Sequence, residues 1–393
     1  MLTLETTRAS GNEKLAAPGP AQARRLGLSN RITVEGVMFI CFALLIGMAA
    51  INTGTNLLYL VLGVMLAMLL TSGLVSRNNM RKLAIARHYP LTLHAGEPAQ
   101  AMIETLNRKR SARSYSLGIM DELVGPIDSW IPAERRVVTG FAGQIGKGDR
   151  AWCPVTLELA ERGLYKLDRA RVVSRYPFGF LEHTVTFEQP GTVLVYPRLF
   201  PASVFMDLSP RVLGEIENNR RGSGVGIFGV RDYEAGDPVR IIHWKQSAKG
   251  QGIKIKEFEE EISQSFMLML DLRCPLDPPQ ALCLEFEKAV SLAASLARQL
   301  IRNGAAVGLW TSAGNIGINN GPYHLNRILR TLACVQPQPP DAVPVAPQHG
   351  LGRLMHLWIQ FQPAASLPGY GGRGGPDFHV IDVRRLKIPG KAQ

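Results

Sequence analysis

The sequence has little cysteine and lacks the short motifs that mark common hydrolases. Neither GxSxG nor HExxH occurs, the eight histidines are scattered, and no nucleophile has a base at a recognisable spacing. No CxxC pair is present, which argues against a zinc knuckle and a disulfide framework and favours reduced thiols. We therefore predict that the protein is not an enzyme. The five cysteines are Cys41, Cys153, Cys274, Cys283 and Cys334.

The composition is that of a folded, basic chain. Its 393 residues suggest two or three domains of ~150 residues each. Apolar residues make up 46%, which excludes a disordered acidic chain and a collagen-like or coiled-coil fibre. Lys and Arg exceed Asp and Glu by 44 to 32, and the net charge of +12 could serve nucleic acid, anionic lipid or an acidic partner.

Charge is absent from residues 36–76, a stretch of 41 residues without Asp, Glu, Lys, Arg or His. A bilayer core of ~30 Å takes about 20 helical residues per crossing, so this stretch accommodates two passes. We predict helices at residues 32–51 and 57–75, which together form a transmembrane helical hairpin over residues 32–76. The poor helix formers that divide them are Asn52, Thr53, Gly54, Thr55 and Asn56.

A cleaved signal peptide is the alternative for the first apolar run, because residues 48–50 resemble a cleavage site. A signal peptide would not account for the second apolar run. Basic residues flank the hairpin on both sides, which predicts that both termini lie in the cytoplasm. They are Arg8, Lys14, Arg24, Arg25 and Arg31 before the hairpin and Arg77, Arg81, Lys82 and Arg87 after it.

Three patterns outside the hairpin predict a membrane-anchored α+β protein. Residues 1–31 lack a periodic apolar face and indicate a flexible cytoplasmic tail. Residues 82–200 hold short period-two alternations broken by Gly and Pro, which are typical of a β-sandwich-like region. Residues 263–393 alternate strands and helices, which predicts an α/β domain with a mainly parallel sheet covered on both faces. The expected strands are 266–272, 305–311, 354–361 and 378–383, and the expected helices are 282–302 and 325–334.

Polar residues follow two of the expected strands of the α/β domain. Ligands of open α/β sheets collect beyond the carboxyl ends of strands, which selects Asp271, Arg273, Thr311 and Ser312. Asp271 is the best single candidate for a site. A structural role is also open, in which Asp271 caps the following turn or pairs with Arg273.

Residues 201–262 form a signature linker and strand pair between the two halves of the body. A GxGxxG at residues 224–229 has no strand leading into it, so we interpret it as a loop and not as a dinucleotide site. A turn and two alternating stretches follow, which predict strands at residues 239–244 and 252–258.

Five basic residues in this linker are followed by four carboxylates. A basic surface beside Trp244 could hold single-stranded nucleic acid, but the carboxylates that follow would repel a phosphate backbone. We favour a structural role, in which Arg231, Asp237 and Arg240 form charge-assisted hydrogen bonds at a junction between domains and Trp244 packs the seam. The basic residues are Arg240, Lys245, Lys249, Lys254 and Lys256, and the carboxylates are those of Glu257, Glu259, Glu260 and Glu261.

The polar residues of the linker also carry a family resemblance. The run comprises Arg231, Tyr233, Gly236, Asp237, Arg240, Ile242, Trp244, Ser247, Ala248, Lys256, Glu259 and Asp271. It resembles the signature of the bacterial family called domain of unknown function 58. The adjacent N-terminal helices, the turn at 161–165, the stretch at 176–180 and the helix at 324–333 fall where that family has similar pieces, so the resemblance covers residues 32–335.

The resemblance implies a protein of the bacterial inner membrane, with a β-rich region and then a von Willebrand factor A-like α/β domain, here residues 263–393. Family members often occur beside MoxR-type AAA+ ATPases, which makes such an ATPase the expected partner. An adhesion-site metal would need Asp-x-Ser-x-Ser, but residues 271–275 read Asp-Leu-Arg-Cys-Pro. Mg²⁺ prefers hard oxygen ligands, so we predict no metal and no other cofactor, with Arg273 in place of the cation.

Together these patterns predict a membrane-anchored cytoplasmic adaptor or assembly factor that acts by protein–protein recognition. The expected binding residues are Arg231, Tyr233, Gly236, Asp237, Arg240, Trp244, Ser247, Lys256, Glu259 and Asp271. One alternative is a metal-dependent hydrolase, in which Asp271, Asp232 or Asp237, and Glu259 converge to within about 5 Å. The other is a basic patch for nucleic acid or anionic lipid, although we expect no nucleic acid as a partner. That patch comprises Arg220, Arg221, Lys245, Lys249, Lys254 and Lys256.

Overall fold

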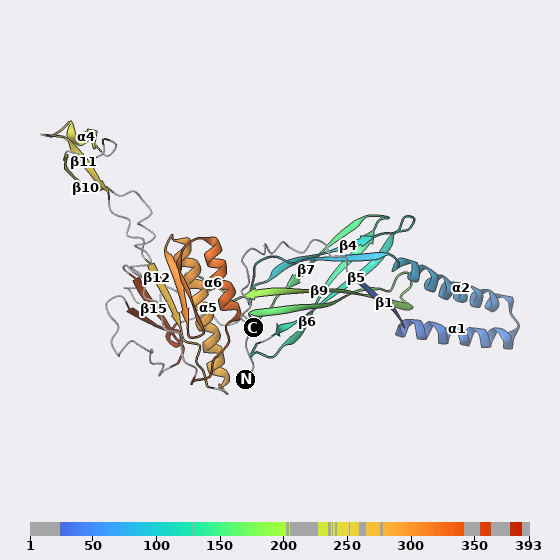
Figure 1. The fold of residues 1–393 in the computed structure, drawn as a ribbon. Helices are drawn as coiled ribbons and strands as arrows, with labels where there is room; N and C mark the ends of the chain where they lie inside the picture. Colours follow the sequence, from blue (N-terminus) through green and yellow to red (C-terminus); the bar gives the residue numbers. More distant parts are fainter. Residues whose placement is uncertain are drawn as a thin grey trace, which may run out of the picture.

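A computed structural model gives the architecture of the chain (Figure 1). A strand and two long helices come first, followed by a β-rich body, a small unit of two strands and a short helix, and an α/β domain. The residues that the structure describes are 24–127, 129–201, 204, 227–234, 237, 239, 242–250, 252–258, 265–275, 278–341, 354–362 and 378–386.

The two apolar helices, α1 (Val34–Thr53) and α2 (Asn56–Asn79), lie side by side and extend away from the β-rich body (Figure 1). Each is long and apolar enough to cross a membrane. Gly54 ends α1 in a left-handed conformation with φ of +64°, which glycine adopts without strain, and its N–H donates to Ala50 O at 2.9 Å. Helix α2 continues beyond the predicted end because Arg77, in its last turn, is favourable near a helix C-terminus.

A strand, β1 (Arg24–Ile32), precedes α1 and pairs antiparallel with β9 (Leu181–Tyr196). The prediction of a flexible tail over residues 1–31 is therefore wrong for residues 24–31. Strand β1 lies at the edge of its sheet with nearly all of its side chains exposed, so its sequence has no alternating apolar face to reveal it. Residues 1–23 lie outside the described residues.

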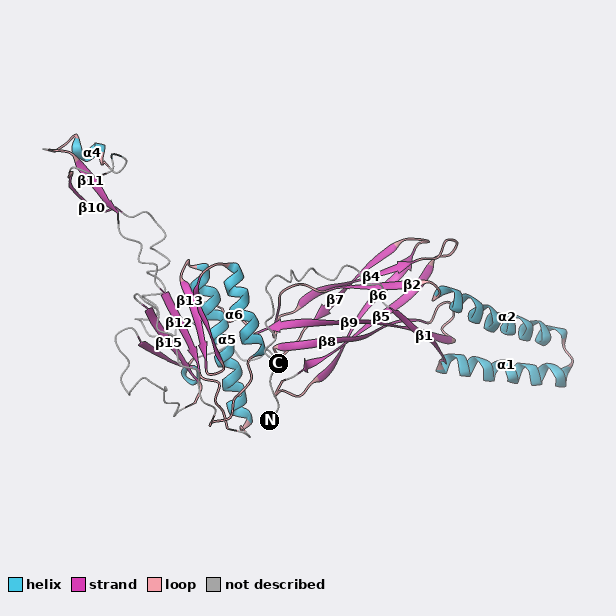
Figure 2. Ribbon diagram, in the orientation of Figure 1, coloured by secondary structure: helices cyan, strands magenta, loops and turns pink. Residues whose placement is uncertain are grey.

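The β-rich body consists of two sheets that share one core (Figure 2). One sheet has the strand order β1-β9-β8-β5-β6, with β3 paired to β9, and the other has the order β2-β4-β7. Ile103 and Val155 of the smaller sheet pack with Leu117 and Phe187 of the larger one, as in a β-sandwich. The remaining strands are β2 (Leu83–His88), β3 (Leu93–His94), β4 (Ala99–Asn107), β5 (Ser114–Ile127), β6 (Glu134–Ile145), β7 (Arg150–Leu157) and β8 (Gly163–Ser174).

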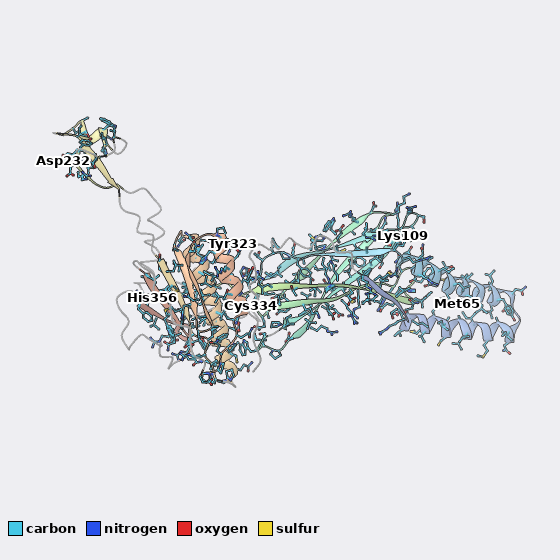
Figure 3. The ribbon with its side chains drawn as sticks, in the orientation of Figure 1. Met65, Lys109, Asp232, Tyr323, Cys334 and His356 are labelled. Carbon is cyan, nitrogen blue, oxygen red and sulfur yellow. The ribbon has the colours of Figure 1, made fainter. Side chains whose placement is uncertain are left out.

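Polar contacts fix the end of α2 to the sandwich, at the place where Figure 3 labels Lys109. The buried Lys109 amine donates to the backbone oxygens of Asn78 (3.0 Å) and Asn79 (2.8 Å) and to Ser114 Oγ (2.6 Å). Burial lowers the pKa of Lys109 to about 8. The Asn79 side chain also bonds both backbone groups of Tyr115. Lys109 thus satisfies carbonyls that a helix C-terminus leaves unpaired, and it joins α2 firmly to β5.

The start of α1 is joined to the turn between β8 and β9. Thr33 accepts a hydrogen bond from Gly36 N at 3.0 Å and donates to Gly179 O at 2.6 Å, while its own N–H donates to Phe180 O at 3.1 Å. Gly36 leaves no room for a side chain, because an added Cβ would collide with Phe180 O. The Phe180 ring stacks on Phe39 of α1 with ring centroids 4.3 Å apart.

The α/β domain contains a five-stranded sheet in the order β14-β13-β12-β15-β16 (Figure 2). Neighbouring strands are parallel except β14, which pairs antiparallel with β13 and was not predicted. Strand β14 has two glycines and only Ile316 buried, so it carries a weak strand pattern. The elements are β12 (Ser265–Leu270), α5 (Gln280–Arg302), β13 (Ala306–Thr311), β14 (Gly314–Asn319), α6 (Pro322–Cys334), β15 (Leu354–Gln360), β16 (Phe378–Asp382) and the 3₁₀ turn Val383–Arg385.

Both described helices of this domain, α5 and α6, pack in one core against the same face of the sheet. The opposite face holds a separate apolar cluster that includes Met267, Met269, Trp310 and Trp358. The side chains of this second cluster are also buried, so among the described residues both faces of the sheet are covered, as expected, while both described helices lie on one face. Continuous apolar strands indicate that both faces are buried, but they do not say which element covers each face.

A buried arginine joins the sandwich to the α/β domain. Arg162, in the turn before β8, donates through Nε to Leu332 O at 3.0 Å and through Nη2 to Val335 O at 2.8 Å. Its Nη1 forms an ion pair with Glu287 of α5. Burial lowers the pKa of Arg162, yet the guanidinium stays charged at neutral pH.

The strands β10 (Ile227–Asp232) and β11 (Lys254–Phe258) pair antiparallel and form, with the short helix α4 (Trp244–Ser247), a small unit that we call the signature unit. The predicted strand at residues 239–244 is wrong, because its partner position is taken by β10. Within this stretch Ile242 forms a single β-bridge, to Ile255, and helix α4 begins at Trp244.

Candidate functional site

The signature unit is held by a bidentate ion pair between two of the predicted signature residues. Arg231 donates from Nη1 and Nη2 to the Asp237 carboxylate at 3.0 and 2.9 Å. Asp237 also accepts a hydrogen bond from Glu234 N at 3.0 Å. The bond from Arg231 holds the pKa of Asp237 below its usual range. This geometry supports the predicted charge-assisted contact and fixes the loop after β10.

A second signature residue, Ser247, joins α4 to β11. Its hydroxyl accepts a hydrogen bond from Lys254 N at 2.9 Å and lies within hydrogen-bond distance of His243 O at 3.1 Å. His243 N in turn donates to Lys254 O at 2.8 Å. These bonds hold the short helix against the strand pair, so Trp244 projects from a defined backbone.

Four apolar side chains are exposed on the signature unit. Trp244 is 65% exposed and Val239 64%, and Ile253 and Tyr233 are 46% and 38% exposed. We call these four residues the apolar surface. We expected Trp244 to pack a seam between domains. Its side chain is instead exposed to solvent. A lone amphipathic aromatic residue in a polar linker fits a buried seam and an exposed contact equally well, so the sequence could not distinguish them.

Several predicted signature residues contribute no described side chain. Gly236, Arg240 and Glu259 lie outside the described residues. Lys256 pairs with Val230 in the strand ladder, and its side chain is outside the described part of the structure. The basic patch is similarly incomplete: Lys245 and Lys249 are exposed and Lys254 pairs with Asp232 at 2.6 Å, whereas Arg220 and Arg221 lie outside.

Asp271 lies at the carboxyl end of β12, the central strand of the α/β sheet. Its buried carboxylate accepts hydrogen bonds from Arg273 N at 3.0 Å, from Nε at 3.0 Å and from Nη2 at 2.6 Å. The bond to Asp271 raises the pKa of Arg273. The pairing of Asp271 with Arg273, one of the two possibilities that the sequence left open, is therefore present in the structure. The positive charge of Arg273 lies beside the carboxylate that would bind the cation in an adhesion site.

The surroundings of Asp271 include two glutamines that the sequence analysis did not select. Ser312 accepts a hydrogen bond from Leu272 N at 3.0 Å and donates to Gln338 Oε1 at 2.7 Å, and Gln362 donates to Arg273 O at 3.0 Å. Gln338 lies in a segment whose composition indicates only a Pro- and Gln-rich loop, so no local signal marked its position. Thr311, predicted with Ser312, bonds Gly314 O at 2.9 Å within its own hairpin.

The described carboxylates do not gather into a metal site. Among the described residues no group of three or more His, Cys, Asp or Glu side chains could hold a metal ion. Asp232 and Asp237 pair with basic residues of the signature unit, Asp271 pairs with Arg273, and Glu259 lies outside. The convergence that a hydrolase would need is absent from the part of the chain that the structure describes.

Two cavities lined by ionisable groups of the described residues are small. One, beside Asp271 and Arg273, has a volume of about 10 Å³, which is room for about one water molecule. The other, on the smaller sandwich sheet beside Glu104 and Arg150, measures about 190 Å³. Ligand pockets usually enclose roughly 300–1,000 Å³, so neither cavity suggests a substrate site.

Comparison with known proteins supports the predicted resemblance. Residues 229–349 match the family described as "Protein of unknown function DUF58". That segment contains the described signature residues and Asp271. The chain is also 29% identical over 304 residues to "Uncharacterized protein YeaD" of Bacillus subtilis (strain 168), a match that covers 73% of this chain and 71% of that protein. The resemblance to this family is thus confirmed for residues 229–349.

Two solved structures match this chain with low TM-scores. An ASH/PapD-like domain of human CEP192 has a TM-score of 0.21 at 16% identity and covers 30% of this chain and 88% of its own length. The sporulation control protein Spo0M from Bacillus subtilis has a TM-score of 0.19 at 15% identity and covers 39% of this chain and 57% of its own length. Likenesses of this size do not define a shared fold.

Proposed function

We propose that this protein is a membrane-anchored cytoplasmic adaptor that acts by protein–protein recognition. Helices α1 and α2 are the proposed anchor, and the signature unit is the proposed recognition element. The proposal assigns no catalytic residue and no cofactor to the chain. It places the protein in the bacterial inner membrane with both termini in the cytoplasm, an orientation supported by the basic residues on both sides of the helical pair.

The observation that carries the proposal is the apolar surface of the signature unit. Trp and Tyr side chains commonly dominate the binding energy of protein interfaces because they bury a large area at a low cost in conformational entropy. The neighbouring charges of Arg231, Asp237, Asp232 and Lys254 are already paired within the unit. Lys245 and Lys249 are exposed beside Trp244, so a partner that covers Trp244 would leave these two lysines in solvent or meet them with carboxylates.

We infer further that residues 263–393 form a von Willebrand factor A-like domain. The parallel pairs around β12 and the acidic residue at the end of that central strand support this inference. In this domain Arg273 replaces the cation of an adhesion site, so recognition would not depend on a divalent metal. The partner that the family resemblance suggests is a MoxR-type AAA+ ATPase.

Affinity capture from the source cells tests the proposal. The full chain, solubilised in detergent, is used as bait with and without ATP, and captured proteins are identified by mass spectrometry. We expect an AAA+ ATPase in at least one sample, and Trp244→Ala should lose it. Trp152→Ala is the matched control, since Trp152 is 54% exposed on the sandwich. An absence of any AAA+ ATPase from both samples would argue strongly against the adaptor function.

The orientation is tested separately by reporter fusions. Alkaline phosphatase is active outside the cytoplasm and green fluorescent protein folds inside it, so each is fused to the C-terminus of the full chain. We expect fluorescence and no phosphatase activity. The opposite result would place the α/β domain outside the cell, where no AAA+ ATPase could reach it.

A further inference from the structure

The surface of the sandwich around the end of α2 is strongly basic. Three segments meet there: the end of α2 with the following turn (residues 77–82), the β4–β5 loop (107–113) and the β6–β7 turn (145–149). They carry one exposed carboxylate, that of Asp149. We call their exposed cations the basic collar, and they are Arg77, Arg81, Lys82, Arg108, Arg110, Arg113 and Lys147.

Hydrogen bonds hold the three segments together, so the collar is part of the fold. Arg108 N donates to Lys82 O at 2.9 Å, which ties the β4–β5 loop to the turn after α2. Asn107 N donates to Asp149 O at 3.0 Å and Gly148 N donates to Asn107 O at 2.9 Å, which ties the same loop to the β6–β7 turn. The buried Lys109 amine connects the loop to α2 itself.

The length of α2 sets the level of the collar relative to a bilayer. Its 24 residues span about 36 Å at ~1.5 Å per residue, whereas the hydrocarbon core is ~30 Å thick. The last turn of α2, with Arg77, therefore extends into the headgroup layer. The collar residues that follow α2 lie at this level or just beyond it.

The start of α1 adds an aromatic contact at the same level. Phe178, in the turn between β8 and β9, is 44% exposed, and its ring lies 5.7 Å from that of Phe180. Phe180 stacks on Phe39, and its backbone accepts a hydrogen bond from Thr33 at the residue before α1. Aromatic side chains are enriched where a membrane-spanning segment meets water. The exposed Phe178 and the cations of the basic collar thus both lie at the end of the sandwich that carries α1 and α2.

We infer that the basic collar binds the headgroups of anionic phospholipids in the bilayer that holds α1 and α2. This inference rests on the membrane anchoring in the proposed function, and it concerns a surface distinct from the basic patch of the linker. Clusters of Lys and Arg next to a membrane span attract anionic lipid, and each cation strengthens the attraction about fivefold. Phe178 inserts beside the collar, so the sandwich rests on the lipid surface with a fixed orientation.

Lipid retention by the purified full chain tests the inference. The chain is delipidated in dodecyl maltoside, mixed with phosphatidylglycerol or phosphatidylcholine, and the bound lipids are counted by native mass spectrometry. We expect tighter retention of phosphatidylglycerol, a preference that decreases in high salt. The triple variant Arg81→Gln, Arg110→Gln, Arg113→Gln should weaken it by at least about tenfold, and the same three positions changed to Lys should retain it.

The matched control removes three exposed arginines from the α/β domain through Arg302→Gln, Arg327→Gln and Arg385→Gln. It should retain phosphatidylglycerol as the unchanged chain does. Equal retention of the two lipids, a preference independent of salt, or an equal loss in the control would overturn the inference. Displacement of the lipid by inorganic phosphate or by a single-stranded oligonucleotide beyond that caused by sodium chloride at the same ionic strength would also overturn it. Because micelles have no sides and no partner is added, the outcome is independent of the capture and fusion experiments.

Discussion

The guanidinium carbon of Arg162 lies 5.6 Å from the centroid of the Phe286 ring. Arg162 belongs to the sandwich and Phe286 to α5 of the α/β domain, so this cation–π contact crosses between the two parts of the body. The Trp130 ring approaches Phe286 edge-on at 6.0 Å, and Phe200 N donates to Ser295 Oγ of α5 at 2.8 Å. The α/β domain is therefore attached to the sandwich by several specific contacts, with Arg162 at their centre.

Replacing Arg162 is expected to loosen this attachment. Arg162→Ala leaves Glu287 and the carbonyls of Leu332 and Val335 without their donor, and such losses destabilise by about 3–5 kcal/mol. The free energy of unfolding of the solubilised full chain in urea measures the effect, and hydrogen exchange should increase first in α6. Arg384→Ala is the control, because Arg384 forms an exposed pair with Asp382 and should change stability little. Equal effects of the two variants would contradict a special role for Arg162.

Arg273 is predicted to exclude a divalent cation from Asp271. Arg273→Ser removes the positive charge that bonds this carboxylate and adds a hydroxyl oxygen, which is a ligand that Mg²⁺ and Mn²⁺ accept. We expect millimolar Mn²⁺ to raise the thermal midpoint of Arg273→Ser but not that of the unchanged chain. Adding Asp271→Asn to the variant should abolish the shift. Micromolar binding of Mn²⁺ by the unchanged chain would show that Arg273 does not exclude a divalent cation from Asp271.

Acidification is predicted to weaken the pairing of β1 with β9. The His183 side chain is buried, its Nδ1 lies 2.6 Å from Asn30 Oδ1, and burial lowers the pKa of His183. Below the usual histidine pKa of about 6.5 the unfolded chain takes up a proton that the folded chain resists. The contribution of the neutral His183 to the free energy of unfolding should therefore be fully present above the usual histidine pKa. It should decrease as the pH falls below that value toward the lowered pKa of the folded chain.

Chemical unfolding of the full chain between neutral and mildly acidic pH measures this dependence. His183→Gln should flatten it, since an amide can bond Asn30 but does not titrate. The control is His379→Gln, which changes a histidine of β16 in the α/β domain. The hypothesis would be wrong if the chain lost stability equally with and without His183.

Gly36 is predicted to be essential for the junction between α1 and the sandwich. Gly36→Ala introduces a Cβ that collides with Phe180 O, a backbone atom that cannot move away easily. Overpacking of this kind costs about 1–3 kcal/mol, and we expect a lower thermal midpoint in detergent. Gly63→Ala is the matched control in α2, where an added Cβ meets nothing within 4 Å. It should be neutral or should stabilise the helix by up to about 1 kcal/mol.

The helical pair could be predicted closely from the sequence because lipid imposes a strict requirement on composition. A stretch of this length without charge is rare outside membrane-spanning helices, and residues 52–56 mark the turn. The helix ends were less accurate, since a charged residue such as Arg77 continues α2 instead of ending it. The strands and helices of the α/β domain were found for a similar reason, because their apolar runs are long and periodic.

Elements whose stability comes from distant partners could not be predicted. Strand β1 has a polar sequence and exists because β9 offers it an edge. Strand β10 contains Gly229 and pairs with β11 across more than twenty residues, so local propensity gave no reason to select it over residues 239–244. Register and partner choice depend on the whole sheet, which a single sequence does not specify.

The candidate site was predicted in part. The contact between Arg231 and Asp237 was expected from opposite charges in a short loop, and the structure has it. The exposure of Trp244 was not expected, and the bond between Ser312 and Gln338 joins residues 26 positions apart. Arg162 contacts residues more than 120 positions away along the chain. Proximity of this kind is a property of the fold, and it has no local signature.

Strand β9 runs the full length of the sandwich, from the start of α1 to the α/β domain. It begins at Leu181, next to the Phe180 that bonds Thr33, and ends at Tyr196, four residues before the Phe200 that bonds Ser295. Its 16 residues extend over about 50 Å at ~3.3 Å per residue. Under the proposed membrane anchoring, the sandwich holds the α/β domain about 50 Å from the lipid surface, so a membrane-bound partner would need a domain of similar length to reach it.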